Sequence, residues 1–193
     1  HNHAIIFGQK KITYHTLDKL TDNIASGLIN LGLKKSDKVA IFLDNCPEFV
    51  ISYFAILKAG CVVVPINYMF KIEETKFIIE NSDTVALITS RAYITSAEEL
   101  RLRIDALKHI IVTGKIKNDS LIDFQTLEKN TSPNKASIKP EDLAVILYTS
   151  GTTGHPKGAM LSHYNLVSNA IDSSSAIKIT PKDTFICILP LFH

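Results

Sequence analysis

The stretch KVAIFLDNCPEFVISYFAILKAGCVVVPI, residues 38–66, decides the fold class, because it predicts a strand, a helix and a second strand in succession. KVAIFL (38–43) and CVVVPI (61–66) are short, continuous apolar runs of the kind that form strands buried on both faces. The segment between them has the composition of a helix, with Asn45 as its predicted cap and Pro47 in its first turn. Two strands joined through a helix predict a parallel pair.

The same alternation continues on both sides of this stretch. Upstream, apolar residues recur at helical spacing from Leu17 to Leu31, with Thr16 as the predicted cap and Gly32 as the predicted end. Far downstream of 38–66, Ser162 is expected to cap another helix. Downstream, further helices are predicted at 71–82 and 96–107, and further strands at 84–89, 109–113, 143–150 and 184–190. The expected fold is therefore α/β, a doubly wound, mostly parallel sheet flanked by helices.

The composition is that of a globular protein and excludes several classes. Of the 193 residues 46% are hydrophobic and 21% charged, and the net charge of +2 is too small to indicate a nucleic-acid partner. Cys46, Cys61 and Cys187 lack C-x-x-C spacing and lie in or beside apolar stretches, so we expect buried, reduced thiols and a cytoplasmic protein. No apolar run approaches the roughly 18 residues of a transmembrane segment.

The two ends of the sequence predict a piece of a longer protein. The chain begins with His1 rather than methionine, and it stops directly after the apolar run at 184–190. Nothing there has the polar composition of a domain boundary. The polar stretch 128–142, in contrast, is expected to be a surface excursion within the domain.

The stretch YTSGTTGHPKGAM, residues 148–160, follows a predicted strand and contains no carboxylate. Glycine lets backbone N–H groups approach a ligand closely, and α/β sheets bind ligands beyond the carboxyl ends of their strands. We therefore predict a phosphate-binding loop at 148–158 rather than a solvated surface loop. Its predicted binding residues are hydroxyl donors, glycines and one cation: Thr149, Ser150, Thr152, Thr153, Gly151, Gly154, Gly158 and Lys157.

Two common nucleotide motifs do not fit this loop. A P-loop needs a second glycine five positions after Gly151, where Pro156 stands, and Ser or Thr after its lysine, where Gly158 stands. The chain also lacks the G-x-G-x-x-G fingerprint of dinucleotide-binding folds. The loop must therefore belong to another class of nucleotide-binding protein.

The loop resembles the signature of the adenylate-forming acyl-CoA synthetase family, [YF]-T-S-G-[ST]-T-G-x-P-K-G, and residues 148–158 match it at every defined position. AMLSHYNL (159–166) is similar to the usual continuation of that signature. LKAGCVVVPIN (57–67) and LPLFH (189–193) resemble two further family segments, the second of which leads into the acid pocket. The resemblance covers essentially the whole chain and implies the N-terminal part of the family's large AMP-binding domain.

This resemblance implies an enzyme that uses ATP, Mg²⁺ and coenzyme A. A carboxylic acid would first be joined to AMP with loss of pyrophosphate, and the thiol of coenzyme A would then displace AMP. Lys157 would follow pyrophosphate as a mobile catalytic cation, and Thr152 would reach the Mg²⁺ shell. His193 would lie near the substrate carboxylate. Asn67 favours acyl or aryl substrates, with a fatty acid as the first expectation and an aryl acid as the alternative; the resemblance also allows a homodimer.

Later parts of the family are missing from these residues. There is no Y-G-x-T-E segment, no T-G-D ribose motif and no small C-terminal domain. We therefore expect the 193 residues alone to be inactive. A stand-alone nucleotide- or acyl-binding module is the alternative from another class. A phosphotransferase would need a general base and a Mg²⁺-binding acid near the loop, and the sequence shows neither.

Overall fold

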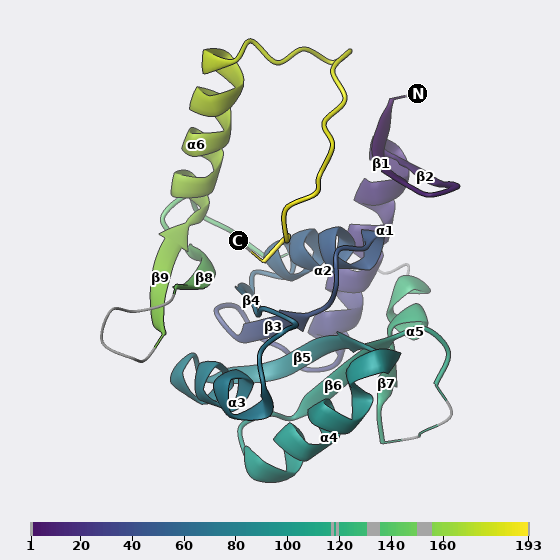
Figure 1. Ribbon diagram of the computed structural model, residues 1–193, viewed down its shortest axis with the longest axis vertical. Helices are drawn as coiled ribbons and strands as arrows, with labels where there is room; N and C mark the ends of the chain where they lie inside the picture. The colour runs from purple at the N-terminus through teal and green to yellow at the C-terminus, as the bar shows by residue number, and fades with distance from the viewer. Residues whose placement is uncertain (1, 117, 119, 131–135, 150–155, 193) are drawn as a thin grey trace.

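A computed structural model describes residues 2–116, 118, 120–130, 136–149 and 156–192 of the chain. Within this described part a central sheet has seven strands and an N-terminal hairpin has two (Figure 1). The strands of the central sheet lie in the spatial order β7 (Ile122–Asp123), β6 (His109–Thr113), β5 (Thr84–Ser90), β3 (Lys38–Phe42), β4 (Val62–Pro65), β8 (Leu143–Thr149) and β9 (Lys157–Ser162). The hairpin consists of β1 (His3–Phe7) and β2 (Lys10–Thr13).

The helices alternate with these strands along the chain. They are α1 (Tyr14–Asn30), α2 (Pro47–Lys58), α3 (Ile72–Asn81), the 3₁₀ turn η1 (Arg91–Tyr93), α4 (Ile94–Arg103), α5 (Phe124–Glu128) and α6 (His163–Ala176). Every ladder of the central sheet is parallel except the one between β8 and β9. The predicted α/β fold with a mostly parallel sheet is confirmed.

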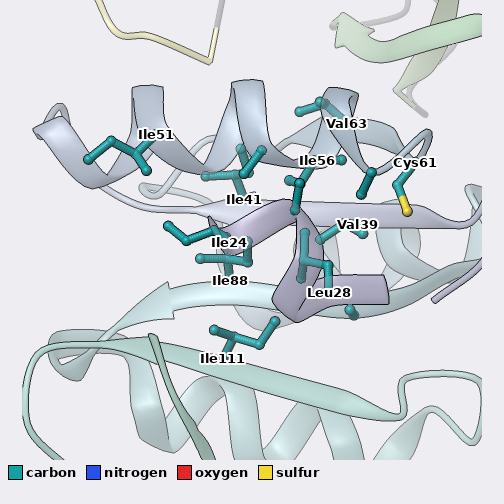
Figure 2. Packing of buried hydrophobic residues seen from close by; sticks show 14 of the residues in the cluster. Ile24, Leu28, Val39, Ile41, Ile51, Ile56, Cys61, Val63, Ile88 and Ile111 are labelled. Atoms are coloured by element: carbon teal, nitrogen blue, oxygen red, sulfur yellow. The ribbon is translucent and has the colours of Figure 1, made fainter. Parts of the chain in front are cut away.

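Helices cover both faces of the sheet, as a doubly wound fold requires. In β3 the alternation of side chains sends Val39 and Ile41 to one face and Ala40 and Phe42 to the other. The first face packs against α1 and α2, and Figure 2 shows the isoleucine-rich contact between them. The second face packs against α3 and α4. None of the helices in the described ranges combines the length and apolarity that a membrane crossing needs.

The structure corrects two of the predicted helix caps. Thr13, not Thr16, caps α1, because the Thr13 hydroxyl accepts a 3.1 Å hydrogen bond from the Thr16 N–H. The residue before α2 is Cys46, which makes no side-chain capping bond, and Asn45 is engaged elsewhere. The Ser162 cap of α6 is confirmed, since its hydroxyl accepts from the Asn165 N–H at 3.2 Å.

The predicted last strand at 184–190 is wrong. In the described part of the chain this segment has no strand partner, and Ile186 and Ile188 are 86% and 84% exposed. Its apolar sequence suits a buried strand, but a strand forms only where a neighbour can take its backbone hydrogen bonds. The predicted burial of the thiols was also wrong for Cys187, which is exposed, and Cys46 is only partly buried. It is confirmed for Cys61, where burial raises the pKa of the thiol to about 12.

Candidate active site

The predicted phosphate loop connects the two antiparallel strands at the edge of the sheet. β8 ends at Thr149 and β9 begins at Lys157, and these two residues are partners in the strand register. Tyr148 and Gly158 form the next pair inward. The structure thus brings together Thr149, Lys157 and Gly158 at the carboxyl end of β8, where the sequence places the loop. The other predicted residues, Ser150, Gly151, Thr152, Thr153, Gly154 and His193, lie outside the described residues.

Lys157 has the exposure that a phosphate-binding cation needs. It is the first residue of β9, and its side chain is exposed to solvent. Among the described residues no carboxylate forms an ion pair with it. Its charge is therefore available to an anion approaching the loop.

Tyr148 anchors the base of the loop to the body of the domain. Its hydroxyl donates a 2.6 Å hydrogen bond to Oδ1 of Asn81, the last residue of α3. Burial raises the pKa of the Tyr148 hydroxyl, so this group remains a donor at neutral pH. This contact could not be predicted from the sequence, because the two residues are 67 positions apart and neither shows a local signal for it.

Strand packing leaves no room for a side chain at Gly158, a residue that is also predicted to contact phosphate. A Cβ atom at this position would lie 2.7 Å from Cγ2 of Ile146 and 3.1 Å from Cζ of Tyr148. Both side chains belong to β8, the strand that pairs with β9. A side chain here would therefore push the two strands that carry the loop apart.

The far end of β9 is fixed to the polar stretch that precedes β8. The His163 N–H donates to the Asp142 carbonyl at 3.1 Å, and the Tyr164 N–H donates to the Pro140 carbonyl at 2.8 Å. The Asp142 carboxylate also pairs with Lys35 at 2.6 Å, which links this stretch to the body of the domain. The predicted surface excursion at 128–142 therefore ends in a defined attachment; its residues 131–135 lie outside the described part.

Two partly buried histidines predict that the stability of this domain depends on pH. His109 begins β6 and His163 begins α6, and both side chains are partly buried. Burial lowers the pKa of each imidazole from its ordinary value of 6.5. Lys108 adds to the lowering at His109, whereas the Asp142 carboxylate partly offsets it at His163.

We expect the free energy of unfolding to fall as the pH drops from about 7.5 to about 5.5. A histidine pKa that is lower in the folded state means that the unfolded state binds more protons in acid. This contribution to stability is fully present well above the unfolded pKa of 6.5 and is lost as the pH falls through 6.5 and then through the lowered folded pKa. Urea unfolding should show a smaller fall for the double variant His109→Gln/His163→Gln, with exposed His15→Gln as control. An unchanged pH dependence in the double variant would refute this origin.

The described residues contain no group of three His, Cys, Asp or Glu side chains that could hold a metal ion. Thr152, the residue predicted to reach Mg²⁺, lies outside the described part.

A mostly parallel sheet with helices on both faces, and a predicted ligand loop beyond the carboxyl end of a strand, is typical of ligand-binding α/β proteins. Comparison with known families identifies which one. Residues 1–193 match the AMP-binding enzyme family over their whole length. The chain belongs to this family, and the resemblance found in the sequence is confirmed.

Individual relatives agree with this assignment. The chain is 35% identical over 191 residues to crotonobetaine/carnitine–CoA ligase of Escherichia coli O6:K15:H31, covering 95% of this chain and 37% of the relative. The ATP-bound crystal structure of MatB from Rhodopseudomonas palustris is 29% identical with a TM-score of 0.82, covering 95% of this chain and 36% of MatB. The anthranilate CoA ligase AuaEII, crystallised with anthranoyl-AMP, is 26% identical with a TM-score of 0.78, covering 83% of this chain and 32% of AuaEII. The chain thus spans about a third of the length of these proteins.

Proposed function

We propose that these residues are the N-terminal portion of an acid–thiol ligase, an enzyme that converts a carboxylic acid to its acyl-CoA with ATP. The observation that carries this proposal is the register pair of Thr149 and Lys157, which holds the two ends of the adenylate-forming signature together at the carboxyl end of β8. The signature itself, residues 148–158, is complete. The remaining parts of the site would come from elsewhere in a longer protein.

The chemistry proceeds in two displacements. A carboxylate oxygen of the substrate attacks the α-phosphorus of ATP, and the bond from that phosphorus to the pyrophosphate oxygen breaks. The thiolate of coenzyme A then attacks the acyl carbon, and AMP leaves with the electron pair of the acyl–oxygen bond. Because the substrate supplies the first nucleophile, the protein needs to supply position and charge neutralisation.

The residues of the loop fit the first displacement. The exposed ammonium group of Lys157 would neutralise the charge that develops on departing pyrophosphate, and Thr149 would donate its hydroxyl to a phosphate oxygen. The same roles are proposed for Ser150, Thr152 and Thr153, with Gly151 and Gly154 allowing close backbone approach. Mg²⁺ would neutralise phosphate charge when it arrives bound to ATP. His193 is proposed to lie near the substrate carboxylate.

Two features of the relatives support this chemistry. MatB binds ATP, which is the first co-substrate of the proposed reaction. AuaEII holds anthranoyl-AMP, which is an acyl adenylate of the kind that the first displacement would form. Both proteins share the fold of this chain over most of its length.

The substrate class remains a choice among acids of different shape. Our first proposal is a fatty acid, from the LPLFH segment and Asn67. A carnitine-like acid is favoured by the name of the E. coli relative, and an aryl acid by that of AuaEII. The free thiols of Cys46, Cys61 and Cys187 support a reducing compartment, and we propose the cytoplasm.

The direct test is pyrophosphate release by the intact protein with Mg-ATP, coenzyme A and a panel of acids. We expect release that depends on the acid and is fastest with a fatty acid. If release is fastest with carnitine, crotonobetaine or anthranilate, the proposed ligase activity stands and the proposed substrate is wrong. No acid-dependent release would reject the ligase in favour of a nucleotide- or acyl-binding module. The 193 residues alone are expected to release none.

A further inference from the structure

The side chain of Asn45 holds a segment that lies far from it in sequence. Its Nδ2 group donates to the carbonyl of Leu189 at 2.8 Å, and its Oδ1 atom accepts from the N–H of Leu191 at 2.8 Å. The carboxamide has one donor side and one acceptor side, and both face the same strip of backbone. Asn45 therefore clamps residues 189–191 as a neighbouring strand would.

Asn45 is placed for this contact rather than for capping the helix that follows. It stands between β3 and α2, but the N-cap position directly before α2 is taken by Cys46, which makes no side-chain capping bond. The hydrogen-bonding groups of Asn45 that could have served α2 are directed to the 189–191 backbone instead. The Asn45 side chain thus binds the backbone of residues 189–191 and does not cap α2.

A buried aromatic ring completes the attachment. Phe192 is only 8% exposed, and its ring meets that of Tyr68 edge to face, with centroids 5.8 Å apart and planes at 77°. In contrast, Ile186 and Ile188 just upstream are almost fully exposed. Figure 1 shows this segment leaving α6 and returning to the domain beside α2. The segment is held to the body of the domain at 189–192.

The attachment lies at a place in the sheet where ligands commonly bind. β4 pairs with one side of β3 and β5 with the other, so the chain changes direction across the sheet at β3. In open α/β sheets the carboxyl ends of strands at such a point form a ligand crevice. Asn45 follows β3 and Tyr68 follows β4, so both stand at this edge.

We propose that Asn45 is a positioning residue for the acid-binding part of the active site. This proposal rests on the proposed function, because the segment it holds, LPLFH, resembles the one that leads into the acid pocket. Asn45 touches the segment and not the reacting atoms: it fixes the backbone at 189–191, and thereby the entrance to that pocket.

The clamp itself is tested by amide hydrogen exchange in the intact protein, which needs no substrate. In Asn45→Ala the Leu191 amide should exchange at least about tenfold faster, since it loses its acceptor, whereas amides of β3 and β5 should be unchanged. Asn30→Ala is the matched control, because it removes another long-range amide contact, a 3.2 Å bond to Asn130, at the end of α1. Equal Leu191 exchange in wild type and Asn45→Ala would overturn the clamp.

The positioning role is tested by steady-state kinetics with the acid that releases pyrophosphate fastest. We expect Asn45→Ala to raise KM for the acid about tenfold and to leave KM for ATP within about twofold. Asn45→Asp keeps the size and the acceptor but loses the donor to Leu189, and it should also raise KM for the acid. An unchanged KM for the acid alongside faster Leu191 exchange would reject the positioning role and keep the clamp. If the wild-type protein shows no acid-dependent release of pyrophosphate, both the proposed function and this positioning role are rejected. The hydrogen-exchange result on the clamp would still stand.

Discussion

Replacing Lys157 with alanine is expected to slow formation of the acyl adenylate roughly 10²–10³-fold, the loss typical of removing one donor that stabilises charge in a transition state. Thioester formation from preformed acyl adenylate should change by less than about threefold, because that step expels AMP and no pyrophosphate. Single-turnover measurements of the two steps in the intact protein separate these effects.

The position of Lys157 in the structure supports this prediction, and the chain also offers a control. Lys157 lies exposed at the start of β9, opposite Thr149, so its ammonium group is presented at the base of the loop. Lys11→Ala removes a lysine from an exposed position on β2, in the N-terminal hairpin, and should leave both steps unchanged. Equal slowing of the two steps by Lys157→Ala would contradict the role assigned to this residue.

The second large effect is expected at Gly158. Changing it to alanine should destabilise the domain by about 1–3 kcal/mol, the usual cost of overpacking, because the new Cβ would lie 2.7 Å from Cγ2 of Ile146. Ile146 is buried and branched at Cβ, so this methyl group cannot swing away on a flexible arm. Urea unfolding of the wild type and of Gly158→Ala gives the difference in free energy of unfolding directly.

Neighbouring substitutions show whether the cause is this contact. Ala159→Val adds bulk at the next position, where the side chain points to the opposite face of β9, and should change stability by less than about 0.5 kcal/mol. Adding Ile146→Ala to Gly158→Ala should cost less than the sum of the two single changes, since it removes the clashing methyl group. Full additivity would locate the effect of Gly158 elsewhere.

The inner part of the fold could be predicted because local pattern and tertiary environment agree there. β3 and β4 are continuous apolar runs in the sequence, and they are buried on both faces by α1 and α2 and by α3 and α4. The end of α1 was also predicted, from Gly32, which adopts a φ of +93° just beyond the helix; Gly60 stands in the same place after α2, with a φ of +74°. Such positive φ values favour glycine at a helix end.

The outer elements could not be predicted, because pairing rather than composition creates them. β9 reads KGAMLS, which has little intrinsic strand preference, and it becomes a strand by pairing with β8. The N-terminal hairpin was missed as well; it turns at Gly8, whose φ is +57°. At 184–190, in contrast, a strand was predicted that does not form. The segment has the apolar pattern of a strand, but it has no partner strand among the described residues.

Part of the candidate site could likewise be predicted from the sequence, and part could not. The hydroxyl donors, glycines and lysine of 148–158 predict phosphate binding from residue type and order alone, and that role stays a prediction. The contacts that hold the site could not be found this way. Tyr148 to Asn81 and Asn45 to Leu189 join residues 67 and 144 positions apart, and a sequence carries no local record of such pairs.

The central claim is that residues 149–158 bind the outer phosphates of ATP. The most direct measurement is a crystal structure of the intact protein with Mg-ATP. We predict that Nζ of Lys157 and the backbone N–H groups of the loop lie within hydrogen-bonding distance of the β- and γ-phosphate oxygens. A triphosphate bound elsewhere, with the side chain of Lys157 directed to solvent, would contradict the account.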